Sequence, residues 1–342
     1  MAVDASVPDP AIVLDLLEAF RRSKTMFAAV SLGVFDTLEA APANLSQLAE
    51  ELDANHDALE RLLDACVTLG LLLRDQAKLY SNTPVATTYL TSTSPRRMTG
   101  YIGYSNSVMW SMWGKLEDAV REGTHRWEQC YGLQGDIFSH FFKTESAKRE
   151  FLMGMHGYGM ITSPQVVAAL DLSRFRHMVD LGGATGHLAI AACKHYPAMH
   201  ATVFDLATVI PLAQEIVRQS PVANRIEFVG GDFFSDTLPS GDLYALGRIL
   251  HDWSEAKILL LLERIFASLP SGGGILVAEK LLLEDKLGPR WAQMQSLNML
   301  TCTEGKERSL SEYEVLLTQV GFTHVIGYRR LQTLSCDARH CI

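Results

Sequence analysis

The sequence lacks the features that mark several large classes of protein. Its six cysteines lie far apart and form no Cys-x-x-Cys pair, so neither a disulfide framework nor a thiolate metal site is predicted. No apolar run is long enough to cross a membrane, and residues 1–10 carry no cationic and apolar signal pattern. Positive charge is in deficit: the formal net charge is −9, which disfavours nucleic acid or an anionic membrane as the main partner. We therefore expect a cytoplasmic protein with free thiols.

The composition is otherwise ordinary for a globular protein, but its pattern changes along the chain. Of the 342 residues, 48% are hydrophobic and 20% are charged, which suits about two domains. Helical spacing dominates up to about Leu170, whereas apolar runs of strand length alternate with helices after it. Such alternation predicts a parallel sheet covered by helices, a Rossmann-like α/β fold. We expect an N-terminal domain at 1–100, a helical connector with the substrate pocket at 101–170, and the Rossmann-like domain at 171–342.

The N-terminal region follows the order helix, turn, helix, hairpin that is typical of a winged helix. Asn44 and Gln47 have the spacing of a capping box at one helix start. The expected elements are helices at 12–20, 24–38 and 57–69 and a hairpin at 71–81. A winged helix either binds DNA or packs against another domain, and the side chains distinguish the two.

The charge on the predicted recognition helix argues against DNA. This helix carries Asp57, Glu60 and Asp64 against Arg61, and phosphate would repel such a face. Apolar side chains nearby favour packing against a second copy of the chain. They are Met26, Phe27, Val30, Leu32, Val34 and Phe35. We therefore expect a homodimer.

Five strands are expected in the Rossmann-like region, each followed by a helical stretch. They cover 177–181, 201–205, 226–230, 243–246 and 274–279. The first runs through Asp180 into a loop of small residues, Gly182–Gly186, and then into a helix at 187–195. Small residues let a ligand approach the backbone and a helix start offers unpaired N–H groups, although an ordinary strand-to-helix turn also uses glycine.

Acidic residues at the next two strand ends indicate an adenosine ligand. Asp205 is placed to accept hydrogen bonds from ribose hydroxyls, or alternatively to cap the next helix. Gly231, Asp232 and Phe233 follow the third strand, where a carboxylate and an aromatic ring suit an adenine base. Three such features at successive strand ends predict a cofactor site.

The loop also distinguishes between adenosine cofactors. A dinucleotide-binding loop has the pattern Gly-x-Gly-x-x-Gly. When this pattern is started at Gly182, Ala184 and His187 occupy the positions of its second and third glycines. Asp180 on the first strand suits a cationic ligand better than a pyrophosphate. Because S-adenosylmethionine carries an ammonium and a sulfonium, we expect it rather than a nicotinamide cofactor.

His251 lies just after the fourth predicted strand, at the sheet edge where α/β active sites form. Methyl transfer to oxygen requires in-line placement of the acceptor and removal of its proton, and a histidine can take that proton. Asp252 is a candidate for the carboxylate that orients it; Glu279 ends the next predicted strand, and Glu307 lies in a segment that follows a helix. His251, Glu279 and Glu307 also have a plain structural interpretation, at a helix start or on a solvated face.

A helical stretch at 293–300 is expected to line the acceptor pocket. Met294 and Asn298 on this stretch, with Trp253, suit a flat apolar acceptor, although Met294 also fits a core position. The sequence has no metal-binding motif and no clustered carboxylates, so no metal is expected.

Several motifs together resemble the plant-type, metal-independent small-molecule O-methyltransferases, and within that family its acetylserotonin O-methyltransferase-like branch. The resemblance covers essentially the whole chain, and the His-Asp-Trp motif is highly specific in this context. The motifs are Asp180-Leu181-Gly182-Gly183, Phe204-Asp205, Gly231-Asp232-Phe233-Phe234, Leu250-His251-Asp252-Trp253, Pro270-Ser271-Gly272-Gly273-Gly274 and Glu304-Gly305-Lys306-Glu307-Arg308.

The resemblance implies a swapped homodimer in which the N-terminal winged-helix domain helps to close the partner's substrate pocket. By position, Asp205 would bind the ribose, Gly231–Phe233 the adenosine region and Arg248 the cofactor. His251 would be the catalytic base for a small aromatic acceptor such as a phenol or a hydroxyindole, and Glu279 and Glu307 could both flank it. The resemblance also leaves open that the chain is one domain of a longer protein.

Three positions depart from the family pattern. Ala184 replaces a glycine and crowds the loop by one methyl, while Phe142 and Gly159 replace a tyrosine and a tryptophan near the cofactor. Losing the large tryptophan is expected to enlarge the pocket. These changes motivate a second hypothesis, in which the chain binds S-adenosylmethionine but acts as a dimeric structural or regulatory module with little or no methyl transfer.

Overall fold

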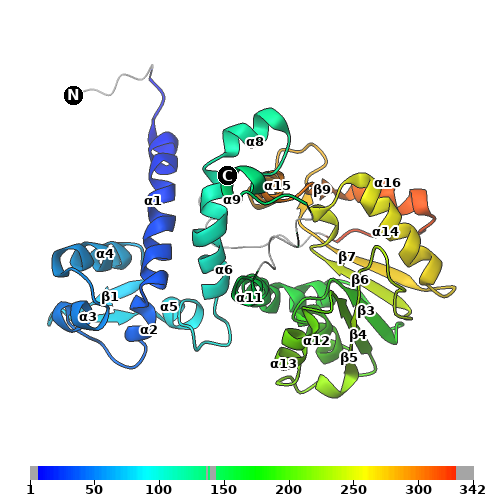
Figure 1. Cartoon of the computed structure of the whole chain (residues 1–342), viewed down its shortest axis with the longest axis horizontal. Helices are drawn as coiled ribbons and strands as arrows, with labels where there is room; N and C mark the ends of the chain where they lie inside the picture. The colour runs from blue at the N-terminus through cyan, green and yellow to red at the C-terminus, as the bar shows by residue number, and fades with distance from the viewer. Residues whose placement is uncertain (1–6, 136–137, 139–143, 329–342) are drawn as a thin grey trace. The chain divides into compact units, whose positions relative to one another are not determined.

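The computed structural model describes residues 7–135, 138 and 144–328 of the chain (Figure 1). The chain divides into two compact units, Met1–Val108 and Met109–Ile342. The expected division into three regions stays a prediction, and Phe142 lies outside the described residues. No helix within the described ranges is long and apolar enough to cross a membrane.

The first unit is a helical domain with one hairpin. Helix α3 (Leu45–Glu51) begins with the predicted capping box, in which the Gln47 N–H donates to the Asn44 side chain at 3.0 Å and the Asn44 N–H donates to the Gln47 side chain at 2.9 Å. Strands β1 (Leu72–Arg74) and β2 (Tyr80–Asn82) form the antiparallel hairpin. The other elements are α1 (Ala11–Ser31), α2 (Val34–Thr37), α4 (His56–Thr68), α5 (Pro84–Tyr89) and α6 (Thr99–Tyr104), followed by a π-helix, Ser105–Met109, that runs into the second unit.

The start of this unit differs from the prediction. The segments predicted as two helices, 12–20 and 24–38, share one long helix, α1, which runs to Ser31. Residues 21–23 join them because arginine and serine are tolerated inside a helix. The break comes later, at Gly33, whose φ of 81° is the left-handed conformation that favours glycine.

The apolar side chains of the first unit also divide differently from the prediction. Val34 and Phe35, expected on an interface, are buried in the core of the unit with Leu48, Leu63 and Tyr80. The exposed apolar surface lies instead on the first half of α1. Its side chains, each more than half exposed, are Ile12, Val13, Leu14, Leu16, Leu17 and Phe20. The first half of α1 is therefore the candidate surface for self-association.

The second unit is built on a five-stranded parallel sheet. Its strands are β3 (His177–Leu181), β4 (His200–Asp205), β5 (Ile226–Gly230), β6 (Leu243–Gly247) and β7 (Gly274–Ala278). They lie in the order β5-β4-β3-β6-β7, and the expected Rossmann-like α/β fold is confirmed. The central strands are buried, which explains why they read as continuous apolar runs.

Helices surround this sheet, and α11 packs along α12 (Figure 1). The helices before the sheet are α7 (Trp110–Trp113), α8 (Leu116–Glu122), α9 (Trp127–Tyr131) and α11 (Glu145–Ala169). The later ones are α12 (His187–His195), α13 (Ile210–Val217), α14 (Glu255–Ser268), α15 (Arg290–Cys302) and α16 (Leu310–Val320). Two short strands, β8 (Leu281–Leu282) and β9 (Arg308–Ser309), form a separate parallel pair.

The strand order reverses between β3 and β6, which lie side by side. Asp180 pairs with Ala245 and Leu181 with Leu246 in this register. Ligands of α/β proteins bind beyond the carboxyl ends of the strands at such a reversal. Since β3 leads into the glycine loop and β6 leads to His251, the two predicted sites begin at adjacent strand ends.

Candidate active site

His251 lies in a short 3-10 helix, Leu250–Asp252, just after β6. Glu279, the residue after β7, holds this segment. Its Oε1 accepts hydrogen bonds from the N–H of Ile249 at 2.9 Å and from the N–H of Leu250 at 2.8 Å. Because β6 and β7 are neighbours in the sheet, the end of one strand fixes the backbone that follows the other.

Glu307 reaches the same imidazole from a distant part of the sequence. Its Oε1 lies 2.7 Å from His251 Nδ1, and Glu279 Oε2 lies 3.4 Å from that nitrogen. Gly305 permits this approach, because a Cβ at that position would lie 2.2 Å from the His251 carbonyl oxygen. On the other side of the ring, Asp252 Oδ1 lies 3.6 Å from Nε2, beyond hydrogen-bond range.

The imidazole and the three carboxylates form a buried charged cluster. Burial alone lowers the pKa of His251, but the charges of Glu279, Asp252 and Glu307 outweigh burial and raise the pKa to about 10. Burial raises the pKa of Glu279 to about 7 and that of Asp252 to about 6. Within the part of the chain that the structure describes, Oε2 of Glu279 and Oε2 of Glu307 are buried without a hydrogen-bond partner. The cluster can therefore take up a proton and hold it.

The fold groups donor atoms that the sequence keeps apart. Ligand atoms of His251, Glu279 and Glu307 lie within 4.8 Å of one another. The prediction from the sequence that the chain has no clustered carboxylates is therefore wrong. Carboxylates from separate loops converge at one edge of the sheet. The imidazole nitrogen that faces the two glutamates, Nδ1, is already hydrogen-bonded to Glu307. That the site works without a metal stays a prediction.

The glycine loop after β3 leaves no room for side chains. A Cβ on Gly182 would lie 2.4 Å from Ile249 Cδ1, and one on Gly183 would lie 2.9 Å from Asp180 Cγ. Ala184 has a φ of 48°, a left-handed conformation that is costly for a residue with a Cβ. Its N–H donates to Oδ2 of Asp205 at 2.8 Å, which holds the strained loop in place.

Two aspartates support this loop. Asp205 also accepts a hydrogen bond from the Leu206 N–H at 2.7 Å, and burial raises its pKa to about 6. Asp180 is buried, accepts a hydrogen bond from the Ala189 N–H at 3.2 Å and has its pKa raised to about 7 by that burial. Both carboxylates therefore have structural contacts, and their expected contacts with a ribose and with a cationic ligand stay predictions.

The predicted adenosine residues and the predicted acceptor residue Trp253 are neighbours. The Phe233 and Phe234 rings lie 4.8 Å apart, and the Trp253 ring lies 4.9 Å from Phe234 and 6.4 Å from Phe233. Asp232 accepts a hydrogen bond from the Phe234 N–H at 2.8 Å. A Cβ on Gly231 would lie 2.7 Å from a phenylalanine ring of β4. Among the described residues, the buried Trp253 Nε1 has no hydrogen-bond partner.

The space beside Gly159 on α11 is filled, contrary to the expectation of an enlarged pocket. A Cβ on Gly159 would lie 2.4 Å from the His187 ring. His187 Nδ1 lies 2.9 Å from Ser163 Oγ, and its Nε2 lies 3.3 Å from Arg248 Nη2. Burial, together with the charge of Arg248, holds the pKa of His187 well below its usual value. The neutral imidazole therefore accepts a hydrogen bond from the guanidinium in the space that the glycine leaves.

Arg248 itself has a strained backbone, with a φ of 61° directly after β6. Its guanidinium carbon lies 4.9 Å from the centroid of the Tyr158 ring. Strained residues that are not glycine concentrate at functional sites, so this conformation supports the predicted role of Arg248.

Lys280 is a residue of this region that sequence reasoning missed. Its Nζ donates to Gln295 Oε1 at 2.6 Å and lies 4.7 Å from the Trp291 ring centroid and 5.6 Å from that of Tyr158. The available signal was its position, since it follows a predicted strand at the edge of the sheet where sites form.

The predicted acceptor residues on α15 differ in their surroundings. Met294 is 47% exposed, so its interpretation as a core residue is wrong. Asn298 is oriented by Trp113, whose Nε1 donates to its Oδ1 at 2.8 Å. Their contacts with an acceptor stay predictions.

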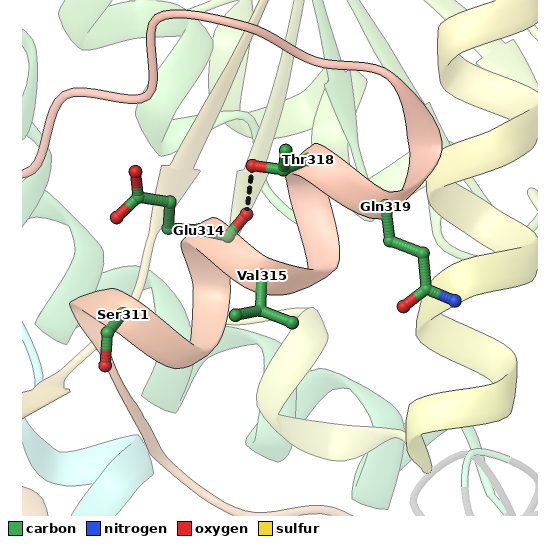
Figure 2. A pocket seen from close by; sticks show the side chains of 5 residues that line it. All are labelled: Ser311, Glu314, Val315, Thr318 and Gln319. Carbon is green, nitrogen blue, oxygen red and sulfur yellow. Dashed lines mark hydrogen bonds between the residues drawn. The ribbon is translucent and has the colours of Figure 1, made fainter.

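A separate shallow pocket lies along α16. Figure 2 shows its lining residues, which are Ser311, Glu314, Val315, Thr318 and Gln319. The drawn hydrogen bond, from Thr318 Oγ1 to the Glu314 carbonyl at 2.6 Å, lies within the helix. None of the candidate site residues lines this pocket.

Two family models match the chain. Residues 113–323 match the O-methyltransferase domain, and residues 14–92 match the O-methyltransferase dimerisation domain. The chain is 40% identical over 322 residues to acetylserotonin O-methyltransferase of Gallus gallus, covering 92% of this chain and 93% of that protein. It is 43% identical over 321 residues to a human protein named probable bifunctional dTTP/UTP pyrophosphatase/methyltransferase protein, covering 93% of this chain and 52% of that one. The chain thus spans about half the length of the bifunctional relative.

Solved structures agree with these relatives. The crystal structure of human N-acetylserotonin methyltransferase in complex with S-adenosylmethionine matches with a TM-score of 0.87 and 38% identity, covering 94% of each chain. PigF with S-adenosylhomocysteine matches with a TM-score of 0.85 and 28% identity, covering 93% of this chain and 95% of that one. The family models, the relatives and the solved structures therefore lead to one conclusion: the chain belongs to the O-methyltransferase family.

Proposed function

We propose that the chain transfers a methyl group from S-adenosylmethionine to a hydroxyl of a small aromatic acceptor, with His251 as the general base. One observation carries the proposal: a buried imidazole lies against two carboxylates, at the strand end next to the glycine loop. The relatives named acetylserotonin O-methyltransferase support an aromatic hydroxyl as the target.

The residues around the loop fit this cofactor. A Cβ on Gly182 or Gly183 would overlap Ile249 or Asp180, so packing within the protein requires small residues in this loop, and a loop of small residues also lets a ligand lie against backbone. Asp205 and Asp232 would hold the ribose and the adenine, and Arg248, a cation, suits the carboxylate of the amino-acid part. When bound, the cofactor would supply an activated methyl group for transfer from its sulfonium sulfur to the acceptor oxygen, and His251 would take the proton that this hydroxyl gives up.

The protein supplies the base and its orientation. Glu307 engages Nδ1 of His251, which leaves Nε2 to accept the proton of the acceptor. A phenol has a pKa of about 10. The carboxylates raise the pKa of His251 towards that of a phenol, which favours transfer of the acceptor proton to the imidazole. Glu279 and Glu307 stabilise the imidazolium that results, and Glu279 also positions its backbone.

Trp253, Met294 and Asn298 form the proposed acceptor pocket. The Trp253 indole N–H is buried without a partner among the described residues, and we propose it as a donor to a polar group of the acceptor. Met294 offers exposed apolar surface, and Asn298 is held in one orientation by Trp113. An indole, a thioether and an amide together suit a flat ring with polar substituents.

We further propose a homodimer formed through a winged-helix N-terminal domain. The exposed apolar half of α1 and the match to a dimerisation domain support this assembly. The thiols of Cys66, Cys130, Cys193 and Cys302 are free, which fits the reducing cytoplasm. The bifunctional human relative supports a longer natural protein that contains this chain as one part.

The decisive experiment follows methyl transfer from S-adenosylmethionine to a panel of phenols and hydroxyindoles. We expect the His251→Gln variant to lose transfer by about 100-fold or more while its Kd for the cofactor, measured by calorimetry, stays unchanged. His200→Gln, at an exposed position at the start of β4, serves as the control. Full activity of His251→Gln would refute the role of the base.

The alternative is a module that binds S-adenosylmethionine and does not methylate. The strained backbone of Ala184 favours it, because a loop shifted by strain would place the methyl group less accurately even though Asp205 fixes it. Tight cofactor binding with no transfer to any acceptor in the panel would support this alternative.

A further inference from the structure

Lys280 is an unusual cation for its surroundings. It lies at the end of β7, directly after the glutamate that positions the base, and its ammonium is largely enclosed by Tyr158, Trp291 and Gln295. The Trp291 indole N–H donates to the Tyr158 hydroxyl at 3.3 Å, so the two aromatic side chains that flank the lysine are linked. The ammonium thus lies between α11 and α15, and α15 is the helix that carries the proposed acceptor residues Met294 and Asn298.

This ammonium lacks an acidic partner. Its hydrogen-bond acceptor among the described residues is the neutral amide oxygen of Gln295, and no described carboxylate lies within ion-pair distance of Nζ. Arg248 is a second cation against the same tyrosine ring, 4.9 Å from its centroid. Two cations around one ring repel each other, and an enclosed ammonium without an anion is unfavourable.

The surroundings of Lys280 also shift the pKa of its ammonium. Burial lowers the pKa of Lys280 to about 8; the glutamates of the base cluster oppose this shift, and Arg248 adds to it. An anion bound at Nζ would oppose this shift and stabilise the ammonium. Such an anion would face α15, the helix that carries Met294 and Asn298, because both Trp291 and Gln295 belong to that helix.

We propose that Lys280 binds an acidic group of the methyl acceptor, so that the preferred substrates are aromatic hydroxy acids rather than neutral phenols. The proposal rests on the proposed methyltransferase function and names its substrate class. Arg248, whose guanidinium contacts His187 beside the glycine loop, remains with the cofactor. Lys280, whose contacts come from α11 and α15, serves the acceptor.

The test compares acids with their neutral amides. The probes are 4-hydroxybenzoate, 4-hydroxyphenylacetate and 3-(4-hydroxyphenyl)propanoate, each beside its primary amide, with wild type, Lys280→Met, Lys280→Arg and the exposed control Lys194→Met. We expect wild type to prefer at least one acid through a lower KM. Lys280→Met should raise that KM by about 10- to 100-fold, as for loss of a charged hydrogen bond, with little change in kcat or in KM for the amide. Lys280→Arg should restore the preference.

A binding measurement keeps the two proposals separate. Calorimetry of the same acids and amides with protein saturated with S-adenosylhomocysteine does not need turnover, so it tests Lys280 even if no probe is methylated. Equal affinity for acids and amides in wild type would overturn the Lys280 proposal and leave the methyltransferase proposal standing.

The cofactor carboxylate is the other anion that Lys280 could hold. Affinities of wild type and Lys280→Met for S-adenosylmethionine and for methylthioadenosine, which has no carboxylate, distinguish the two sources. We expect the ratio of these affinities to be the same in both proteins. A loss confined to S-adenosylmethionine would assign Lys280 to the cofactor and overturn the proposal. Thermal unfolding of each variant shows that the native state is retained.

Discussion

Replacing Glu307 with glutamine should shift the pH dependence of catalysis in a defined direction. Glu307, Glu279 and Asp252 together raise the pKa of His251 to about 10, and Glu307 adds a hydrogen bond of 2.7 Å to Nδ1. The base must be neutral to accept a proton, so kcat should rise with pH towards that value. Glu307→Gln removes one negative charge and therefore lowers the pKa of the imidazole.

The size of the shift follows from the strength of that contact. A hydrogen bond to a charged group contributes about 1.5–3 kcal/mol. Since one pKa unit corresponds to about 1.4 kcal/mol, the rising limb should move to lower pH by about one to two pH units. The plateau should fall by about tenfold or more, because the neutral amide neither stabilises the imidazolium nor strengthens the base.

The assay is a profile of kcat against pH at saturating cofactor and acceptor. Glu304→Gln is the matched control, because this carboxylate lies in the same loop but pairs with Lys257 at 2.8 Å. Its profile should coincide with that of wild type. A rising limb for Glu307→Gln that stays in place, or that moves to higher pH, would refute the reasoning.

Three further substitutions test the framework of the site. Ala184→Gly relieves a φ of 48° and should raise the free energy of unfolding by about 1 kcal/mol in urea; a decrease would contradict the strain argument. Gly159→Ala places a Cβ 2.4 Å from the His187 ring and should destabilise by about 1–3 kcal/mol, and adding His187→Ala should recover part of this loss in a double-mutant cycle. Burial raises the pKa of Asp180 from 3.8 to about 7, so its stabilising contribution is present below about pH 4 and lost by about pH 7; Asp180→Asn should flatten the pH dependence of unfolding in that range.

Local patterns in the sequence predicted the elements of the second unit well. Each of the five strands is present, and the three central ones were clearest because a strand buried on both faces must be a short apolar run bounded by polar residues. The capping box at Asn44 was also predictable from local sequence, since two residues three positions apart, Asn44 and Gln47, contain all of its hydrogen-bonding groups. The extra helix boundary near Lys24 was an error, because no glycine or proline breaks the chain there.

Contacts between distant segments were not predictable from such patterns. The His187 ring fills the space beside Gly159 because α11 and α12 pack together. No local sequence pattern predicts this contact. The convergence of Glu279 and Glu307 on His251 followed from family resemblance, and its physical basis, the close passage of Gly305 over the His251 carbonyl, emerged only in three dimensions. The surroundings of Lys280 are aromatic rings on two helices that are distant in the sequence, so its proximity to the site could not be predicted from local pattern.

The reversal of strand order between β3 and β6 has a consequence for how the chain tolerates change in length. The loop expected to hold the cofactor and the segment that carries the base follow paired strands, so about 4.8 Å of backbone spacing separates their starting points. The 61 residues between Leu181 and Leu243 contain two complete strand-and-helix units that leave the sheet centre and return to it. An insertion in a surface turn of this segment would lengthen the protein without altering the distance between the glycine loop and His251.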